Sequence, residues 1–216
     1  MSTTYRLRVT NNSNAFEQFA VYQNDPDLGV PNAMVMAWFV KGAHPGQSLY
    51  FEWSLDYSIM WSESGITGSP GNAVKFRVGQ EVLCDPSDTD RNGLELTFDD
   101  DVPLLRPAKF ALGTARPGSV YVNELSTLPD SGVGLIGLAI SGRPAYAAPA
   151  ARNRLEVFSP HPNYWISAGT FEAGVALDAE EISAHAQQVQ YANGVYDMSV
   201  DFDRGREWSV RETPDD

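Results

Sequence analysis

The stretch LYFEWSLDYSIMWSES, residues 49–64, decides the fold. Its odd-numbered positions carry large apolar side chains, namely Leu49, Phe51, Trp53, Leu55, Tyr57, Ile59 and Trp61. Its even-numbered positions are mostly small or polar. Successive side chains of a β-strand point to opposite faces, so this period of two predicts one long strand with one face in a core. A helix, at 3.6 residues per turn, would scatter the aromatic side chains around its whole circumference.

Shorter alternating segments recur along the rest of the 216-residue chain, among them Tyr5–Thr10, Phe16–Gln23 and Ser119–Leu125. Clusters of turn-forming residues separate them about every ten residues, which is typical of a sandwich or barrel of short strands. Met34–Val40 is apolar at every position, so we expect a central strand that is covered on both faces or meets a ligand. Asn92-Gly93 predicts a hairpin turn into the strand that follows it.

These elements predict an all-β fold: a single antiparallel β-sandwich, jelly-roll-like, that forms one domain over residues 1–216. We expect residues 1–4 and 212–216 to be frayed. A short helix is predicted near 178–190, because Asp178 is a suitable N-cap and Glu181 stands at the capping-box position three residues later.

The bulk composition narrows the class of partner. The net charge is −13, with 15 basic and 28 acidic residues, so nucleic acids and anionic membrane surfaces are disfavoured partners. The simplest role of this charge is solubility. A single cysteine, Cys84, excludes an internal disulfide. We see no apolar run of membrane-spanning or signal-peptide length, so we expect the protein in the cytoplasm.

Several runs of residues resemble one known family. They include Asn24-Asp25-Pro26, Ala37-Trp38-Phe39, FEWSLDY at 51–57, WSESG at 61–65 and FSPHPNYW at 158–165. Together these runs resemble RhiA, the rhizosphere-expressed protein of root-nodule bacteria, and its relatives, over about residues 5–210. The resemblance implies a bacterial, intracellular protein whose relatives are expressed under quorum control near plant roots. It carries no catalytic residues with it.

An aromatic-lined pocket for a small molecule is the first functional hypothesis. The predicted ligand-binding residues are Trp38, Trp53, Asp56, Tyr57, Trp61, His161, Tyr164 and Trp165. Tryptophan and tyrosine rings supply apolar walls with a polar tip, and their faces attract cations. The alternative is that these side chains fill the core of the sandwich, where aromatic residues dominate the buried area.

An acid–base enzyme is the second hypothesis, and its weak catalytic candidates are His161 and Glu63. Glu52 and Asp56 share one strand face but lie about 13 Å apart at a rise of about 3.3 Å per residue. That exceeds the separation of about 5–9.5 Å in glycosidase carboxylate pairs. The chain has no nucleophile-elbow or phosphate-binding motif, and Gly132–Gly137 lacks the helix that a dinucleotide fingerprint requires. We therefore predict no cofactor and leave open whether the protein is an enzyme.

A calcium loop and self-assembly complete the alternatives. Asp88, Asp90 and Asn92, followed by Gly93, have the spacing of the first calcium ligands of a helix–loop–helix site. A hairpin turn explains Asn92-Gly93 better, and no histidine pair has zinc-site spacing, so we predict no metal site. Self-assembly through strand edges or aromatic patches is the third hypothesis. The sequence does not define the oligomeric state.

Overall fold

The computed structural model describes residues 3–25, 27–62, 74–99, 102–109, 115–130, 133–178 and 185–213. This part of the chain forms β-strands, turns and loops, and it contains no helix. The all-β prediction is therefore confirmed. It also follows that no helix within the described ranges has the length and apolar character needed to cross a membrane.

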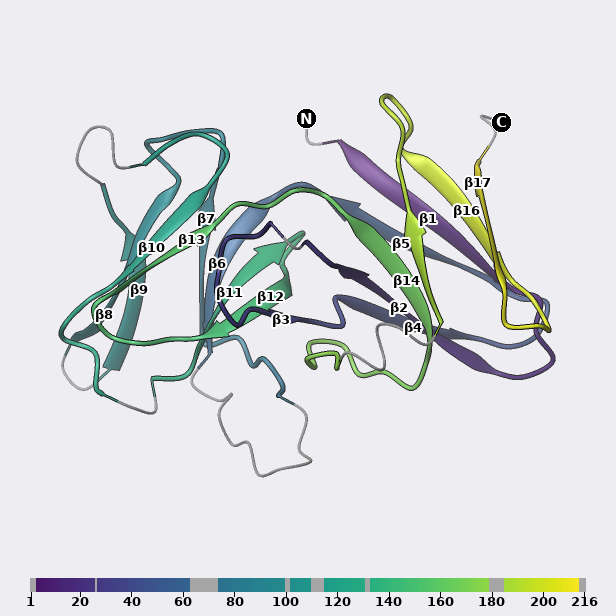
Figure 1. The fold of residues 1–216 in the computed structure, drawn as a ribbon, viewed down its shortest axis with the longest axis horizontal. Helices are drawn as coiled ribbons and strands as arrows, with labels where there is room; N and C mark the ends of the chain where they lie inside the picture. The colour runs from purple at the N-terminus through teal and green to yellow at the C-terminus, as the bar shows by residue number, and fades with distance from the viewer. Residues whose placement is uncertain are drawn as a thin grey trace.

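The strands form four sheets, which Figure 1 shows side by side along an elongated molecule. The terminal sheet has the order β17 (Trp208–Glu212), β16 (Asp197–Phe202), β1 (Thr4–Asn11), β5 (Ser48–Ser54). The β14 sheet has the order β15 (Ala186–Val189), β14 (Tyr164–Gly169), β2 (Glu17–Gln23), β4 (Phe39–Ala43). The central sheet has the order β3 (Met34–Val35), β12 (Arg143–Pro149), β11 (Leu135–Ile140), β6 (Tyr57–Ser62), β7 (Gln80–Cys84). The β8 sheet has the order β13 (Arg154–Phe158), β10 (Val120–Glu124), β8 (Gly93–Asp99), β9 (Val102–Pro107).

Two of the strand pairs are parallel, which the prediction of a purely antiparallel fold missed. β1 pairs in parallel with β16, and β8 pairs in parallel with β10. The strands of each pair are far apart in the sequence, so no tight hairpin imposes opposite directions on them. The β1–β16 pair joins the two ends of the described chain within one sheet (Figure 1).

The predicted long strand is broken at Leu55 and Asp56. β5 ends at Ser54 in the terminal sheet, and β6 begins at Tyr57 in the central sheet. The alternation nevertheless continues in phase across the break: the odd-numbered residues from 49 to 61 all belong to one core, and Phe51, Trp53, Ile59 and Trp61 are 0–5% exposed. One continuous apolar face therefore contributes core residues to both the terminal sheet and the central sheet.

The predicted central strand at Met34–Val40 is wrong: its two ends belong to β3 and β4, which are edge strands of different sheets. The residues between them are nevertheless buried.

The central sheet is covered on both faces. Its second face carries a separate buried cluster: Met36, Met60, Phe76, Leu135, Ala139 and Ala147. Gly137 of β11 lies on this crowded face. A Cβ atom there would come within 2.8 Å of the Tyr146 carbonyl oxygen and 2.9 Å of the Phe76 ring. A side chain at this position would therefore push the covering segment away.

The predicted helix near 178–190 is wrong over its described part. Residues 186–189 form β15, which pairs antiparallel with β14 from Tyr164 to Ser167. Residues 179–184 lie outside the described residues. The capping-box signal concerns only local hydrogen bonds, whereas β15 gains a full ladder against a buried strand, and tertiary pairing prevails over the local preference.

The predicted hairpin at Asn92-Gly93 is also wrong. The strands on either side, β7 and β8, belong to different sheets, and β8 turns back into β9 instead. The Asn92 side chain is fully buried and donates to the carbonyl oxygens of Arg116 and Ser119, at 3.0 Å each. Asn92 therefore anchors a long connection rather than forming a tight turn.

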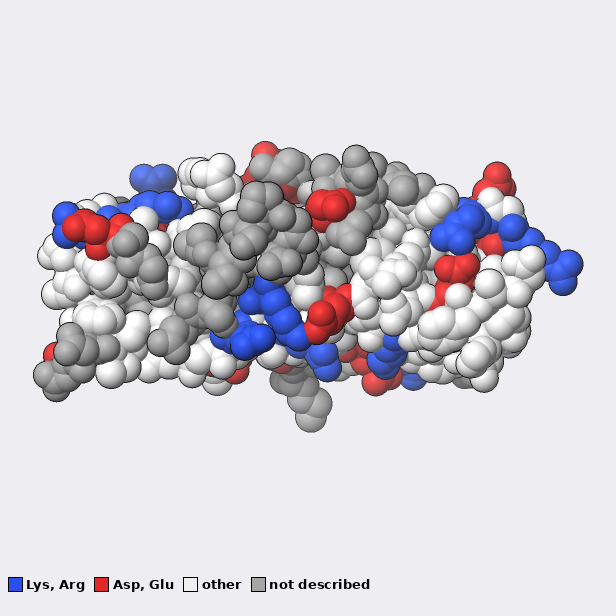
Figure 2. Space-filling view, turned by 90° about the horizontal axis from the view of Figure 1, so that it is seen from below, with Lys and Arg blue, Asp and Glu red and all other residues white. Residues whose placement is uncertain are grey.

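The surface charges of the described residues are mixed. On the face shown in Figure 2, most Lys and Arg side chains lie beside Asp or Glu side chains. Ion pairs such as Lys75–Glu172 and Arg106–Glu95 have this character. Such solvent-exposed pairs contribute about 0–1 kcal/mol each, so the stability of the fold rests on its core.

Two buried indoles differ in their hydrogen bonding. Trp38 Nε1 donates to the Ile140 carbonyl oxygen at 2.9 Å. Trp53 Nε1 is buried without a hydrogen-bond partner. Burial raises the pKa of Tyr164, and the nearby Trp53 N–H offsets part of this rise, although the two groups do not reach hydrogen-bond geometry.

We expect Trp38→Phe to destabilise the protein more than Trp53→Phe. Both changes remove the same atoms from positions that are 1–2% exposed. Only the change at 38 also takes a donor away from a buried carbonyl, which costs about 1–2 kcal/mol more. Urea unfolding followed by far-UV circular dichroism measures the difference, and equal losses for the two variants would contradict this account.

Glu124 is a fully buried acid on the core side of β10, in the row that begins with Val120 and Val122. Its Oε2 accepts the Ala151 N–H at 2.6 Å, and its Oε1 has no hydrogen-bond partner. Burial raises the pKa of Glu124 to about 7, although the Ala151 N–H and the Arg154 charge both lower it. The folded state therefore holds a proton that an unfolded chain releases near its ordinary pKa of 4.5.

We expect the wild-type free energy of unfolding to fall between about pH 4.5 and pH 7 relative to that of Glu124→Gln, which has no proton to lose. The raised pKa corresponds to at most about 3 kcal/mol of stability, present at acid pH and lost above neutrality. Denaturation curves from pH 4 to pH 8 measure this difference. The exposed Glu207→Gln is the control and should change nothing; a flat difference for Glu124→Gln would refute the buried-acid assignment.

Candidate functional site

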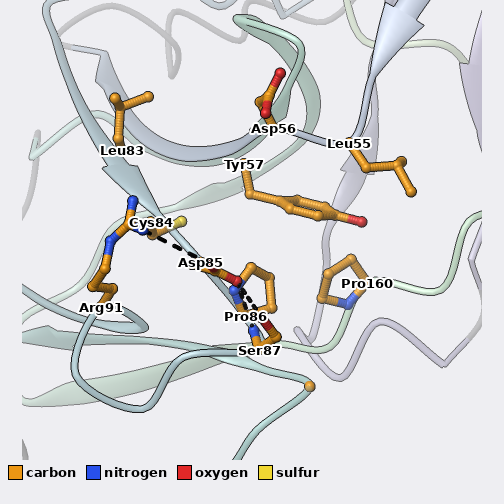
Figure 3. A pocket seen from close by; sticks show the side chains of 11 residues that line it. Leu55, Asp56, Tyr57, Leu83, Cys84, Asp85, Pro86, Ser87, Arg91 and Pro160 are labelled. Atoms are coloured by element: carbon orange, nitrogen blue, oxygen red, sulfur yellow. Dashed lines mark hydrogen bonds and ion pairs between the residues drawn. The ribbon is translucent and has the colours of Figure 1, made fainter. Parts of the chain in front are cut away.

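A cavity lies where the chain bends between β5 and β6. Its volume is about 700 Å³. We call it the Tyr57 pocket; its lining residues are Leu55, Asp56, Tyr57, Leu83, Cys84, Asp85, Pro86, Ser87, Arg91, Gly118 and Pro160. They come from the bend, from the end of β7 and the loop after it, and from two further connections. Figure 3 shows the pocket from close by.

One side of the Tyr57 pocket is apolar. The Tyr57 ring extends between Leu55 and Pro160, and Leu83 stands at the other end of the group (Figure 3). Leu83 is 70% exposed, although it is a large apolar side chain. Burial raises the pKa of Tyr57 to about 12, with smaller contributions from Tyr5 and Cys84. The Tyr57 hydroxyl is therefore protonated at neutral pH and able to donate to a ligand.

The polar side of the pocket is preorganised. The Asp85 carboxylate accepts the hydroxyl and the backbone N–H of Ser87, at 2.7 and 3.0 Å. These two hydrogen bonds lower the pKa of Asp85. Burial opposes them, and the Arg91 charge, at 3.9 Å, makes the smallest contribution, which also lowers the pKa. Asp56 accepts the Ser54 hydroxyl. Fixed carboxylates and one guanidinium thus face an apolar wall, the combination that small-molecule sites use.

The Cys84 thiol belongs to the pocket lining but is only 5% exposed. Burial raises the pKa of Cys84 to about 12; Asp85 adds to this rise and Arg91 opposes it. The thiolate is the reactive form of cysteine, so this thiol has low reactivity in the folded protein.

We expect iodoacetamide to alkylate Cys84 at pH 8 at least about a hundredfold more slowly in the folded protein than in urea, because the raised pKa reduces the thiolate population about a thousandfold. Intact-mass spectrometry over time measures both rates. Rates within about tenfold of each other would show that the pocket exposes an ordinary thiol.

A second cavity, of about 500 Å³, lies beside the segment 161–163. We call it the His161 pocket; its lining residues are Tyr5, Asp25, Asp27, His161, Pro162, Asn163, Tyr164, Gln188, Val189, Gln190 and Tyr191. The Asp25 side chain is 4% exposed, and its Oδ2 lies 3.3 Å from His161 Nδ1 and accepts the His161 backbone N–H at 2.8 Å. The structure thus places a buried carboxylate beside His161.

The predicted ligand-binding residues do not share one pocket. Asp56 and Tyr57 line the first cavity, whereas His161 and Tyr164 line the second. The buried indoles lie in the core: Trp38, Trp53 and Trp61 are 1–5% exposed. Trp165 is half-buried, and its Nε1 donates to Asn163 Oδ1 at 3.1 Å. For these three buried tryptophans, the alternative of core packing is the one that the structure supports.

The remaining candidates give no shared site. Glu63 lies outside the described residues. Asp88 Oδ1 accepts the Asp90 N–H at 2.9 Å, Asp90 lies 3.6 Å from Lys109 Nζ, and Asn92 is buried. These side chains are engaged separately, and the search for three clustered acidic, histidine or cysteine ligands finds none among the described residues.

No sequence pattern predicted Leu83, Pro86 and Arg91 in the first pocket or Asp27 and Gln190 in the second. Each pocket combines several short segments that are distant in the chain. Only the fold brings such segments together, because no regular spacing within one segment encodes them.

Comparison with known proteins identifies relatives over most of the chain. The sequence profile of the RhiA family matches residues 2–213. Protein RhiA of Rhizobium leguminosarum bv. viciae is 29% identical over 211 residues, which cover 96% of this chain and 86% of the relative. No solved structure gives a significant match. The resemblance found in the aromatic runs is confirmed, and the chain belongs to the RhiA family.

Proposed function

We propose that this protein binds a small molecule in the Tyr57 pocket. The observation that carries the proposal is the cavity itself: about 700 Å³, with an apolar wall facing a few fixed polar groups. Ligand pockets of folded proteins usually enclose about 300–1,000 Å³ and have this mixed lining. The high solvent exposure of the Leu83 side chain supports the proposal, because the apolar part of a bound ligand would cover it.

The lining defines the kind of ligand. An apolar body fits against Tyr57, Leu83 and Pro86, and a polar end reaches Asp56 or the Asp85–Arg91 pair. The net charge of −13 favours a small molecule over nucleic acid as the partner, and we keep the cytoplasm as the proposed location.

A β-sandwich is the frame that we propose for this site. Ring contacts between the terminal sheet and the β14 sheet support it. Trp53 of β5 lies 4.9 Å from Tyr164 of β14, and Phe19 of β2 lies 5.7 Å from Phe202 of β16, both between ring centroids. Side chains that interdigitate between two sheets are the hallmark of sandwich packing.

Nile red, a neutral dye whose emission rises in apolar surroundings, tests the Tyr57 pocket. We expect saturable binding that is weakened at least about fivefold by Leu83→Asp, since the change removes an apolar contact and adds a charge. Fluorescence titration measures the affinity.

The matched control is Val102→Asp, which makes the same kind of change at an apolar residue that is 57% exposed and does not line the pocket. It should leave Nile red binding unchanged. Equal losses in the two variants, or no saturable binding by the wild type, would refute the proposal.

A further inference from the structure

The His161 pocket and the Tyr57 pocket share no lining residue, but consecutive residues at 160–162 contribute to both. Pro160 lines the first cavity, whereas His161 and Pro162 line the second. Gln188 and Val189 of β15, together with Gln190 and Tyr191, also line the His161 pocket. Its chemistry differs from that of the Tyr57 pocket and points to another class of ligand.

The charges at the His161 pocket have one sign. Two carboxylates, Asp25 and Asp27, belong to the lining, and no Lys or Arg is present among the lining residues. The whole chain carries a net charge of −13. An anionic ligand would be repelled both at long range and inside the cavity, whereas a cation would be attracted.

Several of the polar groups are occupied within the protein. Asp25 accepts the N–H groups of Asp27 and His161 and contacts the His161 ring. Asn163 donates to the Asn24 carbonyl oxygen and accepts from Trp165 and Gln188. The Tyr191 hydroxyl donates to the Arg6 carbonyl oxygen. These groups shape the cavity and have little capacity left for a ligand.

The groups that remain are mainly hydrogen-bond acceptors. The Asp27 side chain has no hydrogen-bond partner in the described part of the chain, and it is exposed. Gln190 uses its amide N–H on Gln188 Oε1, which leaves its own carbonyl oxygen available. His161 Nδ1 lies 3.3 Å from Asp25 Oδ2, so that nitrogen is engaged within the protein.

We propose that the His161 pocket binds a small organic cation that carries N–H donors, an alkylammonium or a guanidinium. Its N–H groups meet the acceptor oxygens of Asp27 and Gln190, and its charge is neutralised by Asp27. Its alkyl stem lies along Tyr5, Tyr164 and Tyr191, whose ring centroids are 5.1–5.8 Å apart and form one apolar wall. A quaternary ammonium has no N–H to offer these acceptors, and a neutral polyol gains nothing from the carboxylates' charge.

Isothermal titration calorimetry of the full chain at low salt, with agmatine and putrescine as cationic probes and choline and myo-inositol as comparisons, tests this site. We expect agmatine and putrescine to bind and to weaken as salt is raised. Asp27→Asn should weaken agmatine binding at least about tenfold, because it removes a charge-assisted hydrogen bond.

Asp99→Asn is the matched control, since it removes the same single charge from a protein of net charge −13 at an exposed residue that lines neither pocket. Its agmatine affinity should equal that of the wild type. The proposal is overturned if the two variants lose affinity equally, if choline or myo-inositol binds as tightly as agmatine, or if neither cation binds. None of these outcomes bears on Nile red binding, so the two pockets are tested independently.

Discussion

The bend at Leu55 and Asp56 is the constraint on which the rest of the structure depends. It moves the chain from the terminal sheet into the central sheet without changing which face of the strand is buried. A shift of one residue at this point would turn Ile59 and Trp61 away from the core that Trp53 shares with them. The bend is held by the Ser141 N–H, which donates to the Asp56 carbonyl oxygen at 2.8 Å, and by the Ser54 N–H, which donates to the Ser141 hydroxyl. The bend also supplies Leu55 and Asp56 to the lining of the Tyr57 pocket.

The sequence predicted the burial of side chains better than it predicted how the strands pair. The alternation at 49–61 and the apolar run at 34–40 report directly which positions meet the core, because burial is a property of each strand taken alone. Pairing is a property of two strands. Nothing in the segment Tyr5–Thr10 indicates that it lies parallel to β16, nearly the whole chain away. The local signals at Asp178 and at Asn92-Gly93 were misleading for the same reason: tertiary contacts at β15 and around the Asn92 side chain outweigh them.

The predicted site residues fall into two groups, those that line a cavity and those that are buried in the core. Asp56, Tyr57, His161 and Tyr164 were selected because aromatic and polar residues alternate around them, and each lines a cavity. Trp38, Trp53 and Trp61 came from the same pattern and are core residues. An amphipathic strand looks identical whether its apolar face meets a second sheet or a ligand, so the sequence has no means to separate the two cases. The fold separates them: the three indoles line neither cavity, whereas the four other residues do.

The chemistry of each pocket is set by the side chains that are not already buried or hydrogen-bonded within the protein. At the bend, the strand must expose part of its apolar face as it changes sheets, so Leu55 and Tyr57 are only half-buried and the Tyr57 pocket is largely apolar. Beside His161 the walls come partly from loops, whose polar groups first satisfy one another through Asp25 and Asn163. What remains there is a surplus of acceptors without a cationic side chain in the lining. The Tyr57 pocket is largely apolar, whereas the His161 pocket is acidic and rich in acceptors. Their linings meet at one short segment. This arrangement suits two chemically different ligands rather than one extended ligand.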